Sequence, residues 1–246
     1  MIPFNRPLII GHRGFPSAAI ENTIPSFQAA IESGARGIEC DVRATRDGRP
    51  VVFHDEETRR LLGIPGTIRA RTSDEIRSLT FPGTDIRIPD LEDILILAEE
   101  NDAIALVELK GEPLVEITLV RAAIAAVERT RTHGRVAFLS FSHAGIVNLR
   151  ALAPEIPAAP IFEHTPGIDA ALFVGSGWIV IEANAATPRF MEQMRHAGVE
   201  VACYGVDSVE CDRRLDEIGV GLRITNRPDL LSSGRRALAE EKTHAA

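Results

Sequence analysis

Cysteine is scarce in this chain of 246 residues, which has three: Cys40, Cys203 and Cys211. No two of them form a Cys-x-x-Cys pair, and their spacing fits no zinc site. A small, odd number of cysteines is typical of a reducing compartment and excludes a disulfide framework as the basis of the fold. We therefore expect buried, unreactive thiols, with Cys40 packed in the core behind a strand.

The chain also lacks a long apolar run and an excess of basic residues. No apolar stretch approaches the roughly 20 residues that cross a bilayer, and the run that ends at Ile10 is too short for a signal peptide. The net charge of −8 argues against a nucleic-acid partner, which usually requires a basic face. We expect a cytoplasmic protein that acts on a small molecule.

Short apolar runs alternate with segments of helical period along most of the sequence, which is typical of strand–helix units in a parallel sheet. The first expected helix begins after Asn22 or Thr23. Eight expected strands begin near Leu8, Gly37, Ala103, Arg135, Ala158, Trp178, Val199 and Leu222. Eight strands close a TIM barrel, for which about 250 residues are typical. The sequence therefore predicts an α/β fold, a single (β/α)8 barrel domain over residues 1–246.

Residues 55–89 interrupt this rhythm, after a companion strand over residues 50–53. They are rich in glycine and proline and contain one expected short helix, which Thr72 and Glu75 mark as a capping box. A connection of about 35 residues exceeds the usual loop length, so we interpret it as a small insertion or lid. Residues 235–246 are expected to form a polar, frayed tail.

Acidic residues lie near the ends of two expected strands. Glu39 and Asp41 are two residues apart, so their side chains point to the same face of a strand. Glu108 follows the apolar run over residues 104–107. Unpaired carboxylates are rare on buried strands, whereas three of them at neighbouring strand ends suit Mg²⁺ or Ca²⁺. We therefore expect Glu39, Asp41 and Glu108 to hold one divalent cation.

Cations and histidines lie near the same strand ends. His12 and Arg13 follow the first apolar run, His54 follows the companion strand, and Lys110 lies two residues beyond Glu108. The two cations suit an anion such as phosphate, although a salt bridge to a carboxylate is an equally good interpretation for each cation alone. The two histidines suit proton transfer near neutral pH. The sequence thus predicts a metal-assisted phosphate chemistry.

Short motifs that include these residues occur in a fixed order along almost the whole chain. They are His12-Arg13-Gly14, Glu21-Asn22-Thr23 with Phe27, Glu39-x-Asp41-Val42, Thr45-x-Asp47-Gly48, His54-Asp55, Ile88-Pro89-x-Leu91, Glu108-x-Lys110 and Ser140-Phe141. Each motif alone is weak, but their order and spacing are specific. Together they resemble the glycerophosphodiester phosphodiesterase family.

This resemblance implies a TIM barrel that hydrolyses glycerophosphodiesters to glycerol 3-phosphate and an alcohol with a divalent cation. It implies that the metal ligands are Glu39, Asp41 and Glu108, the general acid and base are His12 and His54, the phosphate ligands are Arg13 and Lys110, and the substrate pocket includes Phe141 and Tyr204. Which histidine is the acid, and whether water or the glycerol 2-hydroxyl attacks, stay open at this point. We expect no catalytic role for His133, His143, His164, His196 and His244.

Two segments depart from the family's pattern. Tyr204-Gly205-Val206-Asp207 stands where the family commonly has Trp-Thr-Val-Asn, and Thr225-Asn226 stands where it commonly has Thr-Asp. We expect Asn226 to cap the following helix. Both changes are expected to affect substrate choice rather than reaction type.

Other functions use similar residues. Leu61, Leu62 and Ile64 form an apolar cluster in the insertion, which would suit a lysophospholipase D-like or phosphoinositide-cleaving phosphodiesterase. A barrel that only binds phosphorylated metabolites would have lost a histidine or a carboxylate, and none is missing. A helical metal-dependent phosphohydrolase would carry its His-Asp pair on helices, whereas residues 51–53 favour a strand.

Overall fold

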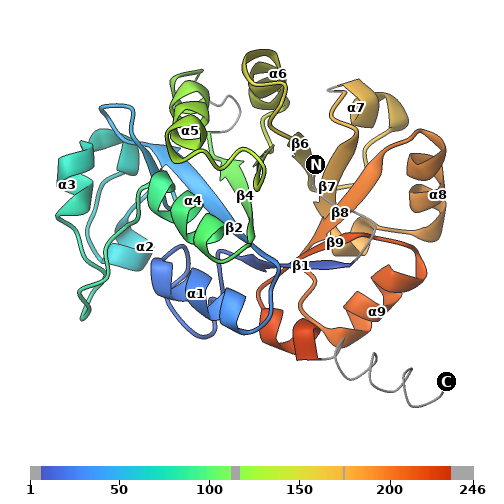
Figure 1. Ribbon diagram of the computed structural model, residues 1–246, viewed down its shortest axis with the longest axis horizontal. Coiled ribbons are helices and arrows are strands. Elements are labelled where there is room, and N and C mark those ends of the chain that lie inside the picture. Colours follow the sequence, from blue (N-terminus) through green and yellow to red (C-terminus); the bar gives the residue numbers. More distant parts are fainter. Residues whose placement is uncertain (1–6, 112–116, 174, 234–246) are drawn as a thin grey trace.

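The protein folds around a closed ring of parallel strands, described in a computed structural model over residues 7–111, 117–173 and 175–233 (Figure 1). The strands are β1 (Leu8–His12), β2 (Gly37–Ala44), β3 (Pro50–Val52), β4 (Ile104–Leu109), β5 (Val136–Ser140), β6 (Ala158–Phe162), β7 (Trp178–Glu182), β8 (Glu200–Tyr204) and β9 (Leu222–Thr225). Hydrogen bonds join them in the order β1-β9-β8-β7-β6-β5-β4-β2, and pairing of β1 with β2 closes the ring. The short strand β3 pairs with β2 antiparallel and lies outside the ring.

Helices surround this ring, as Figure 1 shows. They include α1 (Ile24–Glu32), α2 (Arg59–Leu62), α3 (Ser73–Arg77), α4 (Leu91–Glu100), α5 (Ile117–Thr130), α6 (His143–Leu152), α7 (Ile168–Phe173), α8 (Pro188–His196) and α9 (Val209–Glu217), with 3₁₀ turns η1 (Ile68–Ala70) and η2 (Ala183–Ala185). Residues 228–233 are helical as well. The fold is a TIM barrel, which confirms the prediction, and each ring strand begins within one residue of its expected start. The expected start of α5 near Pro113 and the expected tail lie outside the described residues. Among the helices of the described ranges, none is long and apolar enough to cross a membrane.

Alternation along each strand separates two apolar cores. Outward side chains, such as Ile38, Cys40 and Val42 of β2, pack in a core shared with the helices. Inward side chains fill the barrel: Leu8, Ile10, Leu106, Ala137, Leu139, Ala159, Ile161, Trp178, Val180, Ala202, Leu222 and Ile224. Glu39 and Asp41 alternate with the outward residues of β2 and therefore lie on its inward face.

All three cysteines are free, and two of them are buried as expected. Burial raises the pKa of Cys203 to about 12, which is typical of an inert thiol. The expectation was wrong for Cys211, which is only half-buried. The reason is the orientation of α9, which buries Asp212 and Leu215 instead.

Residues 55–89 pack over a small apolar core of their own. Its buried members are Val51, Phe53, Leu62, Ile68, Ile76, Phe81 and Ile88. The predicted capping box is present on α3, where Thr72 Oγ1 accepts from the Glu75 N–H at 3.3 Å and Glu75 Oε2 accepts from the Thr72 N–H at 2.6 Å. The structure adds a second short helix, α2, whose four residues are too few to produce a helical period in the sequence.

Candidate active site

Strand register aligns polar residues at the carboxyl ends of three neighbouring strands. His12 on β1 pairs with Glu39 on β2, and Asp41 on β2 pairs with Glu108 on β4. These side chains point to the same inward face as the apolar side chains that fill the barrel interior. They therefore meet at the end of the barrel where TIM barrels form active sites.

Glu39, Asp41 and Glu108 form a buried cluster of carboxylates. One oxygen from each lies within 4.8 Å of the others. Oε1 of Glu39 is buried and accepts no hydrogen bond in the part of the chain that the structure describes. An all-oxygen donor set with an unpartnered buried oxygen fits a hard cation such as Mg²⁺ or Ca²⁺.

Burial and neighbouring charges give the three carboxyl groups different pKa values. Burial and the charge of Asp41 raise the pKa of Glu39 to about 8. Burial also raises the pKa of Glu108 to about 7, against the opposing charge of Lys110. Burial acts on Asp41 in the same direction, but Lys110 and Arg13 outweigh it and hold the pKa of Asp41 below its usual value. Asp41 therefore stays ionised at neutral pH, whereas the raised pKa values of Glu39 and Glu108 disfavour their ionised forms even beside Lys110 and Arg13.

Lys110 and Arg13 supply positive charge beside the cluster. Nζ of Lys110 lies 2.9 Å from Oδ1 of Asp41 and 2.5 Å from Oε1 of Glu108. Nε of Arg13 lies 3.2 Å from Oδ2 of Asp41, and the Arg13 backbone N–H donates to Oε2 of Glu39 at 3.1 Å. Each cation thus has a carboxylate partner, and each also lines the central cavity.

His12 and His54 each have one ring nitrogen held by a polar neighbour. Nδ1 of His12 lies 2.8 Å from Oδ1 of Asn226, and Nδ1 of His54 lies 2.8 Å from Oδ1 of Asp55. Nε2 of His12 lies 3.9 Å from Oε2 of Glu39. Burial lowers the pKa of both histidines. Both rings are therefore able to accept a proton at neutral pH.

These side chains line one cavity of about 210 Å³, whose opposite wall is apolar. The lining residues are His12, Arg13, Glu39, His54, Glu108, Lys110, Leu139, Phe141, Ile161, Val180, Tyr204 and Ile224. Of the expected site residues, only Asp41 is absent from this lining, because it is fully buried. A neighbouring cavity of about 620 Å³ shares His54 and Lys110 with it. The structure thus brings the predicted residues to one mouth of the barrel.

Asn22 contacts the carboxylate cluster, although the sequence suggested only a place at the start of a helix. Thr23 is the N-cap of α1. Asn22 instead donates from Nδ2 to Oδ2 of Asp41 at 2.7 Å and accepts from the Asp41 backbone N–H at 3.2 Å. Its φ of 58° is left-handed, a conformation that asparagine tolerates better than most residues. The sequence singled out Asn22 only as part of the motif Glu21-Asn22-Thr23, and the spacing of that motif does not reveal a contact with a strand.

Arg60 on α2 connects the loops behind both predicted proton carriers. Its guanidinium donates to Asp55 at 2.5 Å and 2.9 Å and to Glu21 at 2.7 Å and 3.0 Å. Glu21 also accepts from Arg13 Nη1 at 2.9 Å. Hydrogen bonding to Arg60 is the main reason that the pKa of Asp55 falls to about 2. Sequence reasoning missed Arg60 because the short helix that carries it was not expected.

Asn226 does not cap the following helix, contrary to the expectation. That helical segment begins at Pro228, and Oγ1 of Thr225 accepts from the Arg227 N–H at 2.9 Å. The Asn226 side chain lies instead between His12 and Asp207, with Nδ2 donating to Oδ2 of Asp207 at 2.8 Å. The two departures from the family's pattern are therefore in direct contact.

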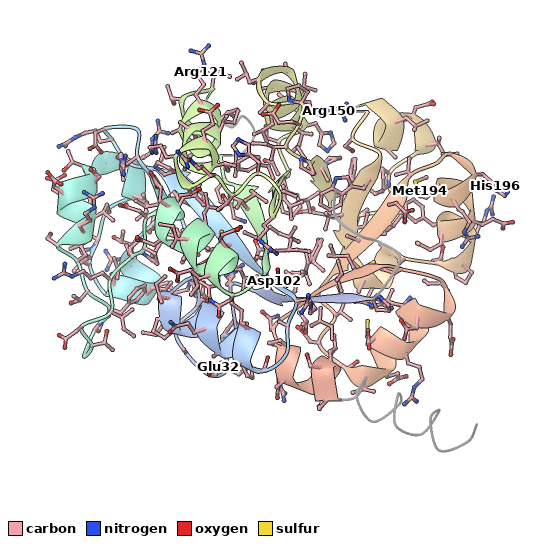
Figure 2. All side chains as sticks on the ribbon, viewed as in Figure 1. Glu32, Asp102, Arg121, Arg150, Met194 and His196 are labelled. Carbon is pink, nitrogen blue, oxygen red and sulfur yellow. The ribbon has the colours of Figure 1, made fainter. Side chains whose placement is uncertain are left out.

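Among the described residues, no histidine other than His12 and His54 lines the central cavity. His133 and His164 line other cavities, and the ring of His143 packs against Phe162 with 4.6 Å between centroids. Figure 2 shows His196 at the outer edge of α8. His244 lies outside the described residues.

Sequence comparison relates this chain to known phosphodiesterases over nearly its whole length. A model of the glycerophosphoryl diester phosphodiesterase family matches residues 12–230. The protein YqiK of Bacillus subtilis (strain 168) is 31% identical over 235 residues, which cover 92% of this chain and 97% of YqiK. A glycerophosphodiester phosphodiesterase of Caldanaerobacter subterraneus subsp. tengcongensis is 28% identical over 243 residues, which cover 92% of this chain and 96% of the relative.

Solved structures share the same barrel. A glycerophosphodiester phosphodiesterase from Agrobacterium tumefaciens str. C58 superposes with a TM-score of 0.80 at 27% identity, over 92% of this chain and 99% of that one. An Oleispira antarctica phosphodiesterase in complex with the product sn-glycerol-3-phosphate superposes with a TM-score of 0.86 at 21% identity, over 94% of this chain and 98% of that one. At 21% identity, the likeness to the Oleispira antarctica structure shows a shared fold alone.

Proposed function

Because the chain belongs to the glycerophosphoryl diester phosphodiesterase family and is a phosphoric diester hydrolase, we propose that it hydrolyses glycerophosphodiesters to glycerol 3-phosphate and an alcohol. One observation carries the proposal. Three buried carboxylates, two cations and two histidines converge at a single mouth of the barrel. This set can neutralise a phosphodiester and move protons on both sides of it.

The cation site would consist of Glu39, Asp41 and Glu108, whose oxygens fit Mg²⁺ or Ca²⁺. A cation bound there supplies charge stabilisation to a phosphate oxygen. Asn22 supports the site by holding Asp41 through two hydrogen bonds. Burial raises the pKa values of Glu39 and Glu108, and a cation bound there would stabilise their ionised forms.

Arg13 and Lys110 would bind the phosphate oxygens that the cation leaves exposed. Both side chains line the cavity while their carboxylate partners fix their positions. Lys110 acts as a compact point charge, and Arg13 offers a planar set of donors. Phe141 and Tyr204 lie on the apolar wall and would pack against the carbon atoms of the substrate.

His12 and His54 would carry the protons. One takes a proton from the attacking hydroxyl, and the other gives a proton to the leaving alkoxide, which departs as the alcohol. The attacker is water, or it is the 2-hydroxyl of the substrate's own glycerol, in which case water then opens the resulting cyclic phosphate to give glycerol 3-phosphate. Detection of a cyclic phosphate by ³¹P NMR during turnover would identify the second route.

The sequence feature that favoured a lipid substrate has a structural explanation. Leu62 is buried in the small core of residues 55–89, and Leu61 and Ile64 pack against that core. Packing against this core accounts for the apolar character of the cluster without a lipid ligand. We accordingly put forward a water-soluble diester as the substrate.

The test is release of glycerol 3-phosphate from a panel of diesters. Glycerophosphocholine, glycerophosphoethanolamine, glycerophosphoglycerol and a lysophospholipid are each assayed with Mg²⁺, Ca²⁺ or chelator. We expect cation-dependent cleavage of at least one glycerophosphodiester and its loss in Glu39→Gln combined with Asp41→Asn. Glu32→Gln, a change on the outer surface of α1 (Figure 2), is the matched control. Full activity in chelator would remove the cation from the scheme, and cleavage of the lysophospholipid alone would overturn the substrate assignment.

A further inference from the structure

The side chain of Asn226 connects His12 to Asp207, an acidic residue outside the central cavity. Oδ1 of Asn226 lies 2.8 Å from Nδ1 of His12. On its other side, Asn226 donates to Asp207 twice, from Nδ2 to Oδ2 at 2.8 Å and from the backbone N–H to Oδ1 at 2.7 Å. Oγ1 of Thr225 adds a third hydrogen bond to Oδ1 of Asp207 at 3.1 Å. The carboxylate of Asp207 is thus fixed by three donors.

Donor and acceptor chemistry decides how the Asn226 amide is oriented. A carboxylate only accepts hydrogen bonds, so the NH₂ group of Asn226 must face Asp207. The carbonyl oxygen of the amide must then face His12. Because this oxygen also only accepts, Nδ1 of His12 must carry the hydrogen.

We propose that Asn226 and Asp207 are positioning residues that hold neutral His12 as its Nδ1–H tautomer. Nε2 is then the ring atom of His12 that exchanges protons with the substrate. This atom faces the site, 3.9 Å from Oε2 of Glu39. The inference rests on the proposed function of His12 as a proton carrier, and it adds the two residues that determine the orientation and tautomer of the His12 ring.

The backbone around the two residues makes the arrangement rigid. Asp207 follows β8 and Asn226 follows β9, and these strands are neighbours in the barrel. The Val206 N–H donates to the carbonyl of Ile224 at 3.2 Å, which extends the pairing to the loop before Asp207. His54 has a comparable arrangement, because Asp55 holds its Nδ1 at 2.8 Å. Both histidines are therefore anchored through Nδ1.

The direct test is ¹⁵N NMR of the ring nitrogens in the full-length protein labelled at histidine. The His12 signals are identified by their loss in His12→Gln, and spectra are compared at a pH where the ring is neutral. We expect a protonated Nδ1 and an unprotonated Nε2 in the wild type. In Asn226→Ala the Nε2–H tautomer should become populated. A predominant Nε2–H form in the wild type, or an unchanged tautomer in Asn226→Ala, would overturn the proposal.

An exchange of the two side chains provides a rescue that does not depend on one variant. In Asp207→Asn the residue at 207 can donate as well as accept, so the amide of Asn226 is free to turn and the tautomer should become mixed. Asn226→Asp combined with Asp207→Asn places a carboxylate against His12 and an amide behind it, which should restore the Nδ1–H form. Asp229→Asn, which removes an ion pair with Arg227 on the same segment, should leave the tautomer unchanged.

Turnover gives the second measurement. We expect kcat to fall about tenfold or more in Asn226→Ala and in Asp207→Asn, while KM stays nearly constant. Losses of this size are typical when a hydrogen-bond partner that orients a functional histidine is removed. In the exchanged pair kcat should recover. A change in KM alone would contradict a positioning role. The NMR result requires no substrate, so an absence of glycerophosphodiester cleavage in the wild type would overturn the proposed function while the tautomer test stands by itself.

Discussion

Nζ of Lys110 lies 2.9 Å from Oδ1 of Asp41 at the carboxyl end of the barrel. The same ammonium group contacts Glu108, so one positive charge joins two of the three clustered carboxylates. Only 11% of the Lys110 side chain is exposed. Solvent therefore screens this interaction far less than it screens a surface ion pair.

Replacement of Lys110 should destabilise the cation-free protein. Lys110→Met leaves Asp41 and Glu108 without their nearest positive partner, and breaking a buried ion pair costs about 3–5 kcal/mol. We expect a loss of this size in urea unfolding with chelator present, and partial recovery when Mg²⁺ or Ca²⁺ is added. Arg121→Met, on the outer side of α5 (Figure 2), should have little effect. Equal stability of Lys110→Met and the wild type in chelator would show that the pair is not important for folding.

The two site histidines should be required for turnover and not for folding. His12→Ala and His54→Ala should each lower kcat by about 10²-fold or more, the smallest contribution typical of a positioned proton carrier. Circular dichroism and thermal unfolding check that each variant keeps the fold. His196→Ala, at the outer edge of α8, is the matched control. Wild-type rates in both site variants would reject the acid and base roles.

Gly14 should tolerate alanine much less well than Gly48. Both have left-handed backbones, with φ of 85° and 80°, and alanine in this conformation costs about 1–2 kcal/mol. A Cβ on Gly14 would also lie 2.5 Å from the carbonyl carbon of Ser26, whereas a Cβ on Gly48 meets nothing within 4 Å. Crowding adds about 1–3 kcal/mol at Gly14. Urea unfolding of Gly14→Ala and Gly48→Ala measures the difference, and equal losses would mean that the Ser26 backbone can move aside.

Asp47 should stabilise the fold in a pH-dependent way. Hydrogen bonds from Thr45 and Ser73 lower the pKa of Asp47 to about 2, below its usual value of about 4. A carboxyl group with a lowered pKa contributes stability above its unfolded pKa and loses it as the pH falls through the folded value. Asp47→Asn should therefore be less stable than the wild type at pH 7, and the gap should narrow below about pH 4.

The measurement for Asp47 is the free energy of unfolding in urea between pH 7 and pH 3. Asp85→Asn is the control, because Asp85 is an exposed aspartate outside the turn that holds Asp47. A gap between Asp47→Asn and the wild type that stays constant over this range would show that ionisation of Asp47 does not contribute.

The barrel and the convergence of its polar residues could be predicted because both follow from alternation along strands. Glu39 and Asp41 share a face with each other and not with Cys40, so a strand that buries Cys40 must turn both carboxylates into the barrel. The same rule relates Glu108 to Lys110. Parallel pairing then brings the carboxyl ends of successive strands to one end of the barrel. This convergence can be predicted without knowledge of side-chain packing.

Contacts made by loop residues could not be predicted in the same way. Asn22 reaches Asp41 from a left-handed turn, and Asn226 reaches His12 across 214 positions of sequence. Neither contact has a period that a sequence pattern could reveal. Arg60 was missed because a helix of four residues has too few turns to show amphipathicity.

The separate core beneath residues 55–89 makes the packing of this insertion largely independent of the packing of the barrel. Exposed positions of the insertion contribute to neither the interior of the barrel nor the layer under its helices. Mutations there can remodel the approach to the site while the chemistry below stays the same. We expect exchange of this segment between homologues to change the approach to the site while the barrel stays folded, provided that Arg60 keeps its bonds to Glu21 and Asp55.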